Sequence, residues 1–168
     1  MHLIIDGYNL LHVGRSQIRL SSTELQWERD QLIEQLSAYK KQKALEITVV
    51  FDGWQGGWRT EKMEKKKGIE LIFSKLGEKA DEVIKRLVRE KGSGVTVVTS
   101  DRDVSRYAER IAVPVIPSDQ FRKKMEIAPM KIENGYGEED EERGLKKKGP
   151  SRRLSKRERR ARAVLKKL

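Results

Sequence analysis

The stretch LIIDGYNLL, residues 3–11, decides the fold class of this 168-residue chain. Its apolar half ends at Asp6, and the runs ITVVFD (residues 47–52) and VTVVTSD (residues 95–101) also end in an aspartate. Short apolar runs that stop at turn residues are typical of buried strands. They alternate with segments of helical periodicity, so they predict an α/β fold with helices on both faces of a mainly parallel sheet.

We expect five strands and four helices in the first 126 residues. The strands are expected at residues 2–5, 47–51, 69–73, 95–99 and 113–116. The helices are expected at residues 22–43, 78–91, 101–111 and 118–125, because apolar residues recur there at helical spacing. Residues 53–68 combine glycine, tryptophan and lysine, a composition that predicts a flexible basic loop.

The composition excludes several kinds of protein. There is no cysteine, which rules out disulfides and thiolate metal sites. With His2 and His12 as the only histidines, a histidine-rich zinc site is not expected. No apolar run approaches the roughly 20 residues of a membrane span, and the start of the chain lacks the basic and apolar regions of a secretory signal. We therefore expect a soluble, cytoplasmic protein with no membrane partner.

The positive charge is concentrated at the end of the chain. Residues 143–168 carry 13 Lys/Arg and one Glu, whereas residues 1–142 have a net charge of −1. We expect a charged extension over residues 127–168, with an acidic block at 138–142 and a basic tail at 143–168. Such a tail favours a polyanion such as RNA, DNA or a ribosome, although it could simply keep the chain in solution.

The tail could end in a helix. Residues 155–168 have helical periodicity, but a lone helix of this length is marginal in water and would need the domain or RNA to hold it. The candidate RNA-binding residues of the tail are Arg152, Arg153, Lys156, Arg157, Arg159 and Arg160.

Four aspartates follow the predicted strands or begin the predicted helices. They are Asp6, Asp52, Asp81 and Asp101. Ligands of open parallel sheets bind outside the carboxyl ends of the strands, and the first and fourth predicted strands should be neighbours at the topological switch point. Carboxylates gathered there would repel one another unless a cation lay between them. Mg²⁺ or Mn²⁺ held by carboxylates and waters is the expected answer.

Each aspartate also has a structural interpretation. Asp101 and Asp103 could be helix N-caps, and Asp52 could be a turn residue. Asp81 lies in the first turn of a helix, where carboxylates are favoured in any case. The structural interpretation is weakest for Asp6, because a carboxylate after a buried strand must find a partner.

Four motifs together resemble one known family. IIDGYNLL (residues 4–11), VVFDG (49–53), ADEVI (80–84) and VVTSDRD (97–103) are similar, in order and spacing, to the motifs of the NYN domain family, in its YacP-like branch. NYN domains belong to the PIN-like nucleases, and the resemblance covers residues 1–126. It implies a metal-dependent endoribonuclease with a PIN-like three-layer α/β/α fold.

The resemblance also assigns roles to residues of this chain. Asp6, Asp81 and Asp101 would be the catalytic and metal-binding acids. The supporting residues would be Asn9, Asp52, Ser100 and Asp103. Some members of the branch act on messenger RNA in the translating ribosome, so mRNA and the ribosome are the expected partners.

Basic and aromatic side chains near the acids are candidates for contact with single-stranded RNA, which is held by basic grooves and by stacking on aromatic rings. The candidates are Tyr8, Arg15, Arg19, Trp54, Trp58, Arg59, Lys62, Lys65, Lys66 and Lys67. The tryptophans could instead pack into the core, with the lysines merely solvated. His12 could move a proton, but a lone histidine is more often structural.

Three other functions compete with the nuclease. A non-catalytic RNA- or ribosome-binding module could keep the fold, although it would have no need of a repulsive acid cluster. A phosphatase with Asp6 as nucleophile would require a second aspartate two residues later, where this chain has Tyr8. The glycine-rich motifs of nucleotide-binding proteins are absent. The RNA sequence preference, the number of metal ions and the oligomeric state stay open.

Overall fold

The computed structural model describes residues 1–14, 21–53, 58–127 and 155–168. In this part of the chain a six-stranded sheet has the order β3-β4-β2-β1-β5-β6. Its strands are β1 (His2–Asp6), β2 (Glu46–Phe51), β3 (Lys62–Lys66), β4 (Ile69–Phe73), β5 (Val95–Val98) and β6 (Val115–Ile116). All neighbouring strands are parallel except β3 and β4. The predicted α/β fold with a mainly parallel sheet is therefore confirmed.

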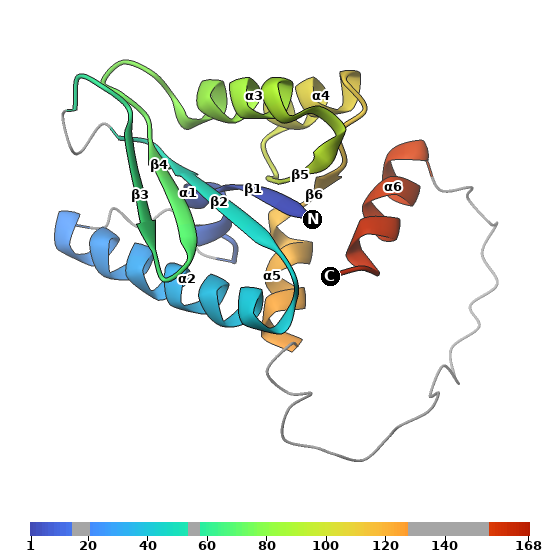
Figure 1. Ribbon diagram of the computed structural model, residues 1–168, viewed down its shortest axis with the longest axis horizontal. Coiled ribbons are helices and arrows are strands. Elements are labelled where there is room, and N and C mark those ends of the chain that lie inside the picture. Colours follow the sequence, from blue (N-terminus) through green and yellow to red (C-terminus); the bar gives the residue numbers. More distant parts are fainter. Residues whose placement is uncertain (15–20, 54–57, 128–154) are drawn as a thin grey trace, which may run out of the picture.

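Helices cover both faces of this sheet. They are α1 (Gly7–Leu11), α2 (Ser22–Gln42), α3 (Ala80–Lys91), α4 (Arg102–Arg110), α5 (Ser118–Ile127) and α6 (Lys156–Leu165), and a short 3-10 turn η2 (Gly92–Gly94) precedes β5. Figure 1 shows α3 and α4 on one face of the sheet and α2 and α5 on the other. This arrangement gives the three layers expected from the sequence.

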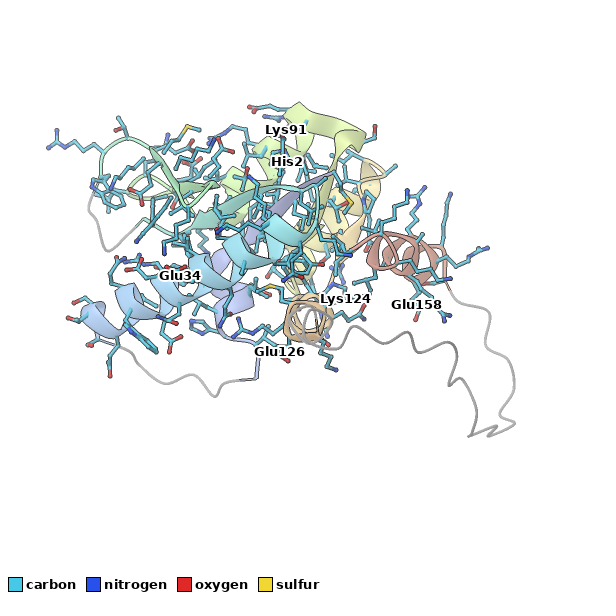
Figure 2. All side chains as sticks on the ribbon, turned by 60° about the horizontal axis from the view of Figure 1, so that its bottom comes forward. His2, Glu34, Lys91, Lys124, Glu126 and Glu158 are labelled. Atoms are coloured by element: carbon cyan, nitrogen blue, oxygen red, sulfur yellow. The ribbon has the colours of Figure 1, made fainter. Side chains whose placement is uncertain are left out.

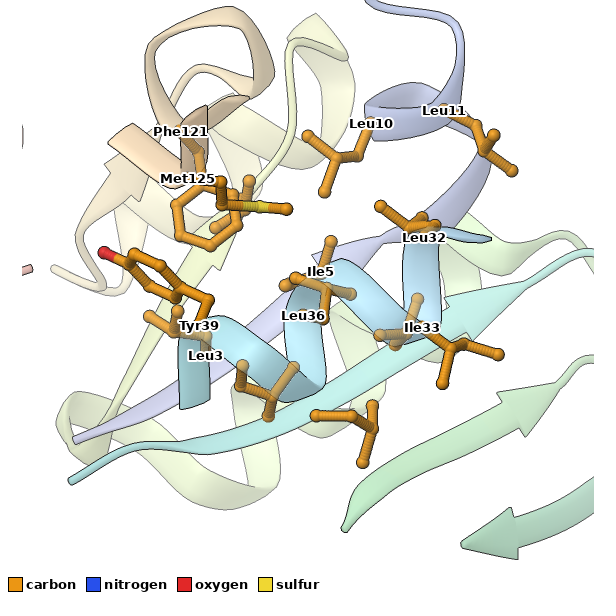
Figure 3. Close-up of a cluster of buried hydrophobic side chains, with 14 of the residues drawn as sticks. Leu3, Ile5, Leu10, Leu11, Leu32, Ile33, Leu36, Tyr39, Phe121 and Met125 are labelled. Atoms are coloured by element: carbon orange, nitrogen blue, oxygen red, sulfur yellow. The ribbon is translucent and has the colours of Figure 1, made fainter. Parts of the chain in front are cut away.

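The core on the α2 face is the larger of two apolar clusters. Leu3 and Ile5 of β1 point into it, while Ile4 between them points to the cluster under α3 and α4. This alternation follows from the two-residue period of a strand. Figure 3 shows Leu36 of α2 beside β1 in the cluster, with Phe121 of α5 close by. Both faces are apolar, which explains why the strand sequences are almost continuous apolar runs.

The predicted loop over residues 53–68 is wrong for residues 62–66, which form the edge strand β3. Its partner is β4, in antiparallel register from Lys62 opposite Phe73 to Lys66 opposite Ile69. The turn consists of Lys67 and Gly68, both with positive φ (52° and 81°), as in the two-residue hairpin turns that match strand twist. Charged side chains on an edge strand discourage pairing with another chain, so a strand of this composition is easily mistaken for a loop.

The C-terminal helix α6 is held by the domain. Ala161 and Leu168 are buried at 8% and 4% exposure, and the hydroxyl of Tyr39 on α2 donates to the carbonyl of Leu168 at 3.0 Å. At the other end, Ser155 and Glu158 form a capping box. Apolar contacts and caps thus supply the support that the isolated helix would lack.

The helix α6 carries basic residues of the tail, and Lys156 and Arg160 lie beside Pro114 and Val115 in a cavity between α6 and the domain. Lys156, Arg159 and Arg160 are exposed, and Figure 2 shows long side chains extending from α6, with Glu158 among them. The structure does not describe Arg152, Arg153 or the acidic block at 138–142, and it does not describe the side chain of Arg157. No helix in that part is long and apolar enough to cross a membrane.

Candidate active site

The carboxyl ends of three neighbouring parallel strands bring the predicted aspartates to one edge of the sheet. Asp6 is the last residue of β1, Asp52 follows β2, and Asp101 is the N-cap of α4 after β5. The predicted adjacency of the first and fourth strands is correct, because β1 and β5 pair with Ile5 opposite Val98. Asp81 reaches the same edge from the first turn of α3. We call these four residues the acid cluster.

Asp6 is a buried acid at the centre of this cluster, with 7% exposure. Its carboxylate accepts hydrogen bonds from the backbone N–H of Asn9 and from the hydroxyl of Thr99, each at 3.1 Å. The pKa of Asp6 is raised to about 6, mainly by burial and also by the charges of Asp81 and Asp52, against the opposing effect of the two hydrogen bonds. The ionised form is therefore disfavoured unless a positive charge is nearby.

The carboxylate of Asp81 is also repelled by neighbouring aspartates. Burial raises its pKa, and so do the negative charges of Asp101 and Asp52, against the opposing effect of Lys85 and Lys79. No described residue donates a hydrogen bond to its carboxylate. Asp81 thus has two lysines near it but no described hydrogen-bond donor to its carboxylate.

Asp52 and Asp101 each make a structural contact through one carboxylate oxygen, and no described residue donates to the other oxygen. Asp52 accepts from the backbone N–H of Ala80 at 2.7 Å, which fixes the start of α3 and hence the position of Asp81. Asp101 caps α4 by accepting from the backbone N–H groups of Asp103 and Val104 at 2.8 and 3.0 Å. In both side chains the same oxygen, Oδ1, takes these bonds, so Oδ2 can serve a ligand.

The donor set of the cluster suits a hard cation. All four side chains offer oxygen only, which favours Mg²⁺ or Mn²⁺ over softer metals. Among the described residues, however, no three His, Cys, Asp or Glu side chains converge on one point in the way a preformed metal site requires. Mg²⁺ needs less than that, because it commonly keeps several waters and uses only one or two carboxylates. The residues therefore fit a hydrated Mg²⁺ rather than an all-protein cage.

A polar network behind Asp6 joins the ends of β1, β5 and β6. The side-chain oxygen of Asn9 accepts from the backbone N–H of Ser100 and from the hydroxyl of Ser118, both at 2.8 Å. The backbone N–H of Ser118 in turn donates to the hydroxyl of Ser100 at 3.0 Å. Asn9 and Ser100 therefore position the loops that carry Asp6 and Asp101.

Asp103 is placed differently from the cluster. It is exposed on the first turn of α4, and its carboxylate accepts from Lys85 of α3 at 2.5 Å. The hydrogen bond and charge of Lys85 lower the pKa of Asp103. The structure thus gives Asp103 a contact that ties α3 to α4 and does not bring it together with the acid cluster.

The aromatic candidates for RNA contact pack partly into the core. The half-buried ring of Tyr8 meets Phe51 edge-on at 5.2 Å, and the ring of Trp58 meets Phe73 at 5.4 Å. Trp54, Arg15 and Arg19 lie outside the described residues. His12 is exposed, and its ring lies 6.3 Å from that of Tyr8.

Several of the basic candidates already have acidic partners. Lys62 pairs with Glu64 at 3.1 Å and also lies 4.8 Å from the ring of Trp58. The other two ion pairs join the end of the hairpin to α2: Lys66 pairs with Asp30, and Lys67 pairs with Glu34. Arg59 and Lys65 are exposed.

The comparison with protein families decides which family this is. The family described as the YacP-like NYN domain matches residues 3–167. The chain belongs to this family. NYN domains have a nuclease-type fold, and the match extends past the motifs at residues 4–103 to include α6.

Relatives of this YacP-like chain agree with the assignment. The Bacillus subtilis (strain 168) protein named "Uncharacterized protein YacP" is 31% identical over 116 residues, which cover 66% of this chain and 64% of that protein. Crystal structures of Rae1 (YacP) from Bacillus subtilis, one of them of a mutant, superimpose with TM-scores of 0.65 and 0.61. Each is 24% identical and covers 79% of this chain, with 79% and 78% of the other chain covered. At this identity the likeness shows the fold.

Two residues of the YacP-like site were not found by sequence reasoning. Thr99 donates to Asp6, and Ser118, fully buried, links Asn9 to Ser100. Ser118 was expected only as the first residue of the helix at 118–125. A signal did exist for Thr99, because it ends the same apolar run that leads to Asp101.

The raised pKa of Asp6 predicts a pH-dependent stability in metal-free protein. The folded state holds the Asp6 proton more tightly than the unfolded chain, so this stabilisation is complete below pH about 4 and is lost as the pH rises through about 6. A pKa shift of this size changes the free energy of unfolding by on the order of 3 kcal/mol over this pH range. Urea unfolding in EDTA from pH 4 to 7.5 measures it. The decline should be smaller in Asp6→Asn, and an equal decline in both proteins would contradict the prediction.

Proposed function

We propose that this YacP-like protein is a metal-dependent endoribonuclease that hydrolyses phosphodiester bonds of RNA, with messenger RNA on the translating ribosome as its substrate. The observation that carries the proposal is the buried Asp6, on which the charges of Asp81 and Asp52 act at the carboxyl edge of the sheet. Membership of a family with a nuclease-type fold supports it. A cation would relieve the repulsion that raises the pKa of Asp6 and Asp81, so this repulsion favours a cationic ligand.

The residues of the cluster would divide the work. Asp6 and Asp101 would hold Mg²⁺ or Mn²⁺, which when bound supplies charge that activates water and stabilises the phosphate as its bond breaks. Asp81 would be a further ligand or the base that orients the attacking water. Asp52 would act through Ala80 by fixing the start of α3, and Asn9 and Ser100 would hold the two acid-bearing loops in register.

A second candidate function is a non-catalytic RNA- or ribosome-binding module. The observation that favours it is the absence, within the described residues, of three convergent metal ligands. The exposed basic side chains of α6, which packs beside β6, suit either function, because phosphate contacts supply affinity without chemistry.

The experiment that tests the proposal compares two RNA substrates. The wild-type protein is incubated with a messenger RNA being translated in a reconstituted system and with the same RNA naked, each with Mg²⁺ and with EDTA. Metal-dependent cuts on the translated RNA alone are the expected result. Cuts on naked RNA as well would make it a general endoribonuclease, and no cuts on either RNA would favour the binding module.

A further inference from the structure

Arg29 of α2 lies at the same edge of the sheet as the acid cluster. Its guanidinium carbon is 6.0 Å from the ring centre of Phe51 and 5.7 Å from that of Phe73. These are the last residues of β2 and β4, and Asp52 comes directly after Phe51. The guanidinium group therefore lies over two rings at the carboxyl ends of the strands, next to the loop that carries one of the acids.

Among the described residues, the hydrogen-bond partners of Arg29 are neutral. One terminal nitrogen donates to the hydroxyl of Tyr8 at 3.1 Å, and the other donates to the side-chain oxygen of Gln26 at 2.6 Å. The Nε–H is buried and finds no acceptor among the described residues. Its neighbour Asp30 feels the charge of Arg29, but the Asp30 carboxylate is hydrogen-bonded to Lys66 and Gln26.

This lack of an acidic partner sets Arg29 apart from nearby cations. Three lysines of the β3–β4 hairpin have a carboxylate within ion-pair distance. They are Lys62, Lys66 and Lys67. Within the part of the chain described, Arg29 has no such ion pair, although it is half-buried. A half-buried cation with neutral partners favours an anionic ligand, because the interaction is stronger away from bulk water.

Phosphate is the anion that this geometry fits. A guanidinium presents its N–H groups in a planar fork that matches two phosphate oxygens. The hydrogen bonds to Tyr8 and Gln26 and the nearby rings of Phe51 and Phe73 restrict the guanidinium, so less side-chain freedom is lost on binding. Tyr8, which accepts from Arg29, is only two residues from Asp6, and the negative charge of Asp52 acts on it.

We propose that Arg29 binds a phosphate group of the RNA strand next to the phosphate that is hydrolysed at the acid cluster. This inference rests on the proposed function, because it takes RNA as the ligand. Arg29 would hold the backbone and not a base, so it would set where the strand lies without selecting a sequence. It would also offset the repulsion between the polyanion and four carboxylates.

RNA binding without cleavage tests the proposal. A fluorescein-labelled single-stranded RNA of about ten nucleotides, long enough for one groove, is titrated in EDTA by anisotropy at several salt concentrations. Arg29→Met should weaken binding about tenfold or more, as expected for a lost charge-assisted contact, and lower the salt slope by about 0.7. Arg29→Lys should fall between, because it keeps the charge but loses the fork.

Arg89→Met is the matched control. Arg89 is exposed in the last turn of α3, at the opposite edge of the sheet, and its replacement removes the same charge. The RNA affinity and the salt slope of Arg89→Met should stay within about twofold of the wild-type values. The reason is that salt at 0.1 M screens an exposed charge from RNA phosphates more than about 10 Å away. An Arg29→Met protein that binds like wild type would overturn the proposal, as would a wild-type protein that binds no RNA.

A second measurement covers the case in which Arg29→Met fails to fold. The Nε–H signal of Arg29 is identified by NMR as the arginine signal missing from Arg29→Lys, and RNA is added to the wild type. A shift of this signal at low RNA concentration supports the site, and an unmoved signal rejects it. Arg29-dependent binding without any Mg²⁺-dependent cleavage would remove the nuclease but keep the phosphate site. If Arg29→Lys cleaves RNA like the wild type and the NMR signal does not move, the nuclease function would stand and the phosphate site would be rejected.

Discussion

Replacing Asp81 with asparagine is expected to lower RNA cleavage by at least about 100-fold, the upper range seen when only an outer-shell partner of a metal is lost. Asparagine keeps the shape of the side chain but removes the charge that would hold Mg²⁺ or orient water. The fold should not suffer, because no described residue donates a hydrogen bond to Asp81 and its pKa is raised by burial and by Asp101 and Asp52. Removing a charge under such repulsion is neutral or slightly stabilising.

Thermal unfolding with and without Mg²⁺ gives this prediction a readout besides activity. A ligand that binds only the folded state raises the melting temperature, so Mg²⁺ should stabilise the wild type and have a smaller effect on Asp81→Asn. Glu82→Gln is the matched control: Glu82 is the next residue on α3, is exposed and pairs with Lys85. It should keep both cleavage and the Mg²⁺ effect. Full cleavage by Asp81→Asn would show that Asp81 is not part of the catalytic group.

The sheet could be predicted from sequence because each parallel strand is an apolar run of its own. Residues 47–51 and 95–98 are buried on both faces, so nearly every position in these strands is apolar. The adjacency of β1 and β5 followed from the rules of doubly wound sheets. The strand β3 has no apolar run, because it is an exposed edge strand of mostly charged residues.

The helix α1 was also missed, for a local reason. It has five residues, starts with Gly7 and depends on Asp6 as N-cap. A single turn carries no helical periodicity to detect. A side chain at Gly7 would lie 2.3 Å from the ring of Phe51, so the glycine reflects close packing that only the folded structure reveals.

The acids of the site could be placed from sequence, but their partners could not. Strand ends bring Asp6, Asp52 and Asp101 to one edge whatever the details of the loops. The contact between Asn9 and Ser118 joins residues 109 positions apart. Likewise, the ion pair of Asp103 with Lys85 depends on how α3 packs against α4. Such contacts depend on distances set by the whole fold, which no local pattern encodes.

Gly53→Ala is expected to destabilise the protein by about 3 kcal/mol, in the upper range for overpacking a close contact. An added Cβ at Gly53 would lie 1.9 Å from the backbone oxygen of Ser74. The backbone must then move, and the hydrogen bond at 3.0 Å from the Gly53 N–H to the Ser74 hydroxyl would be strained. Because Asp52 precedes Gly53 and fixes the start of α3 through Ala80, the same movement should reduce cleavage.

Gly94→Ala separates this clash from the general effect of replacing glycine. A Cβ at Gly94 would meet nothing within 4 Å, so this change should leave stability unaltered or raise it by about 0.5 kcal/mol through the unfolded chain. Urea unfolding of both variants, with the dependence on denaturant checked for a common slope, measures the difference. Equal urea midpoints for Gly53→Ala and Gly94→Ala would mean that the backbone after β2 can move at little cost. The position of Asp52 would then depend on the Ala80 hydrogen bond more than on the packing of Gly53 against Ser74.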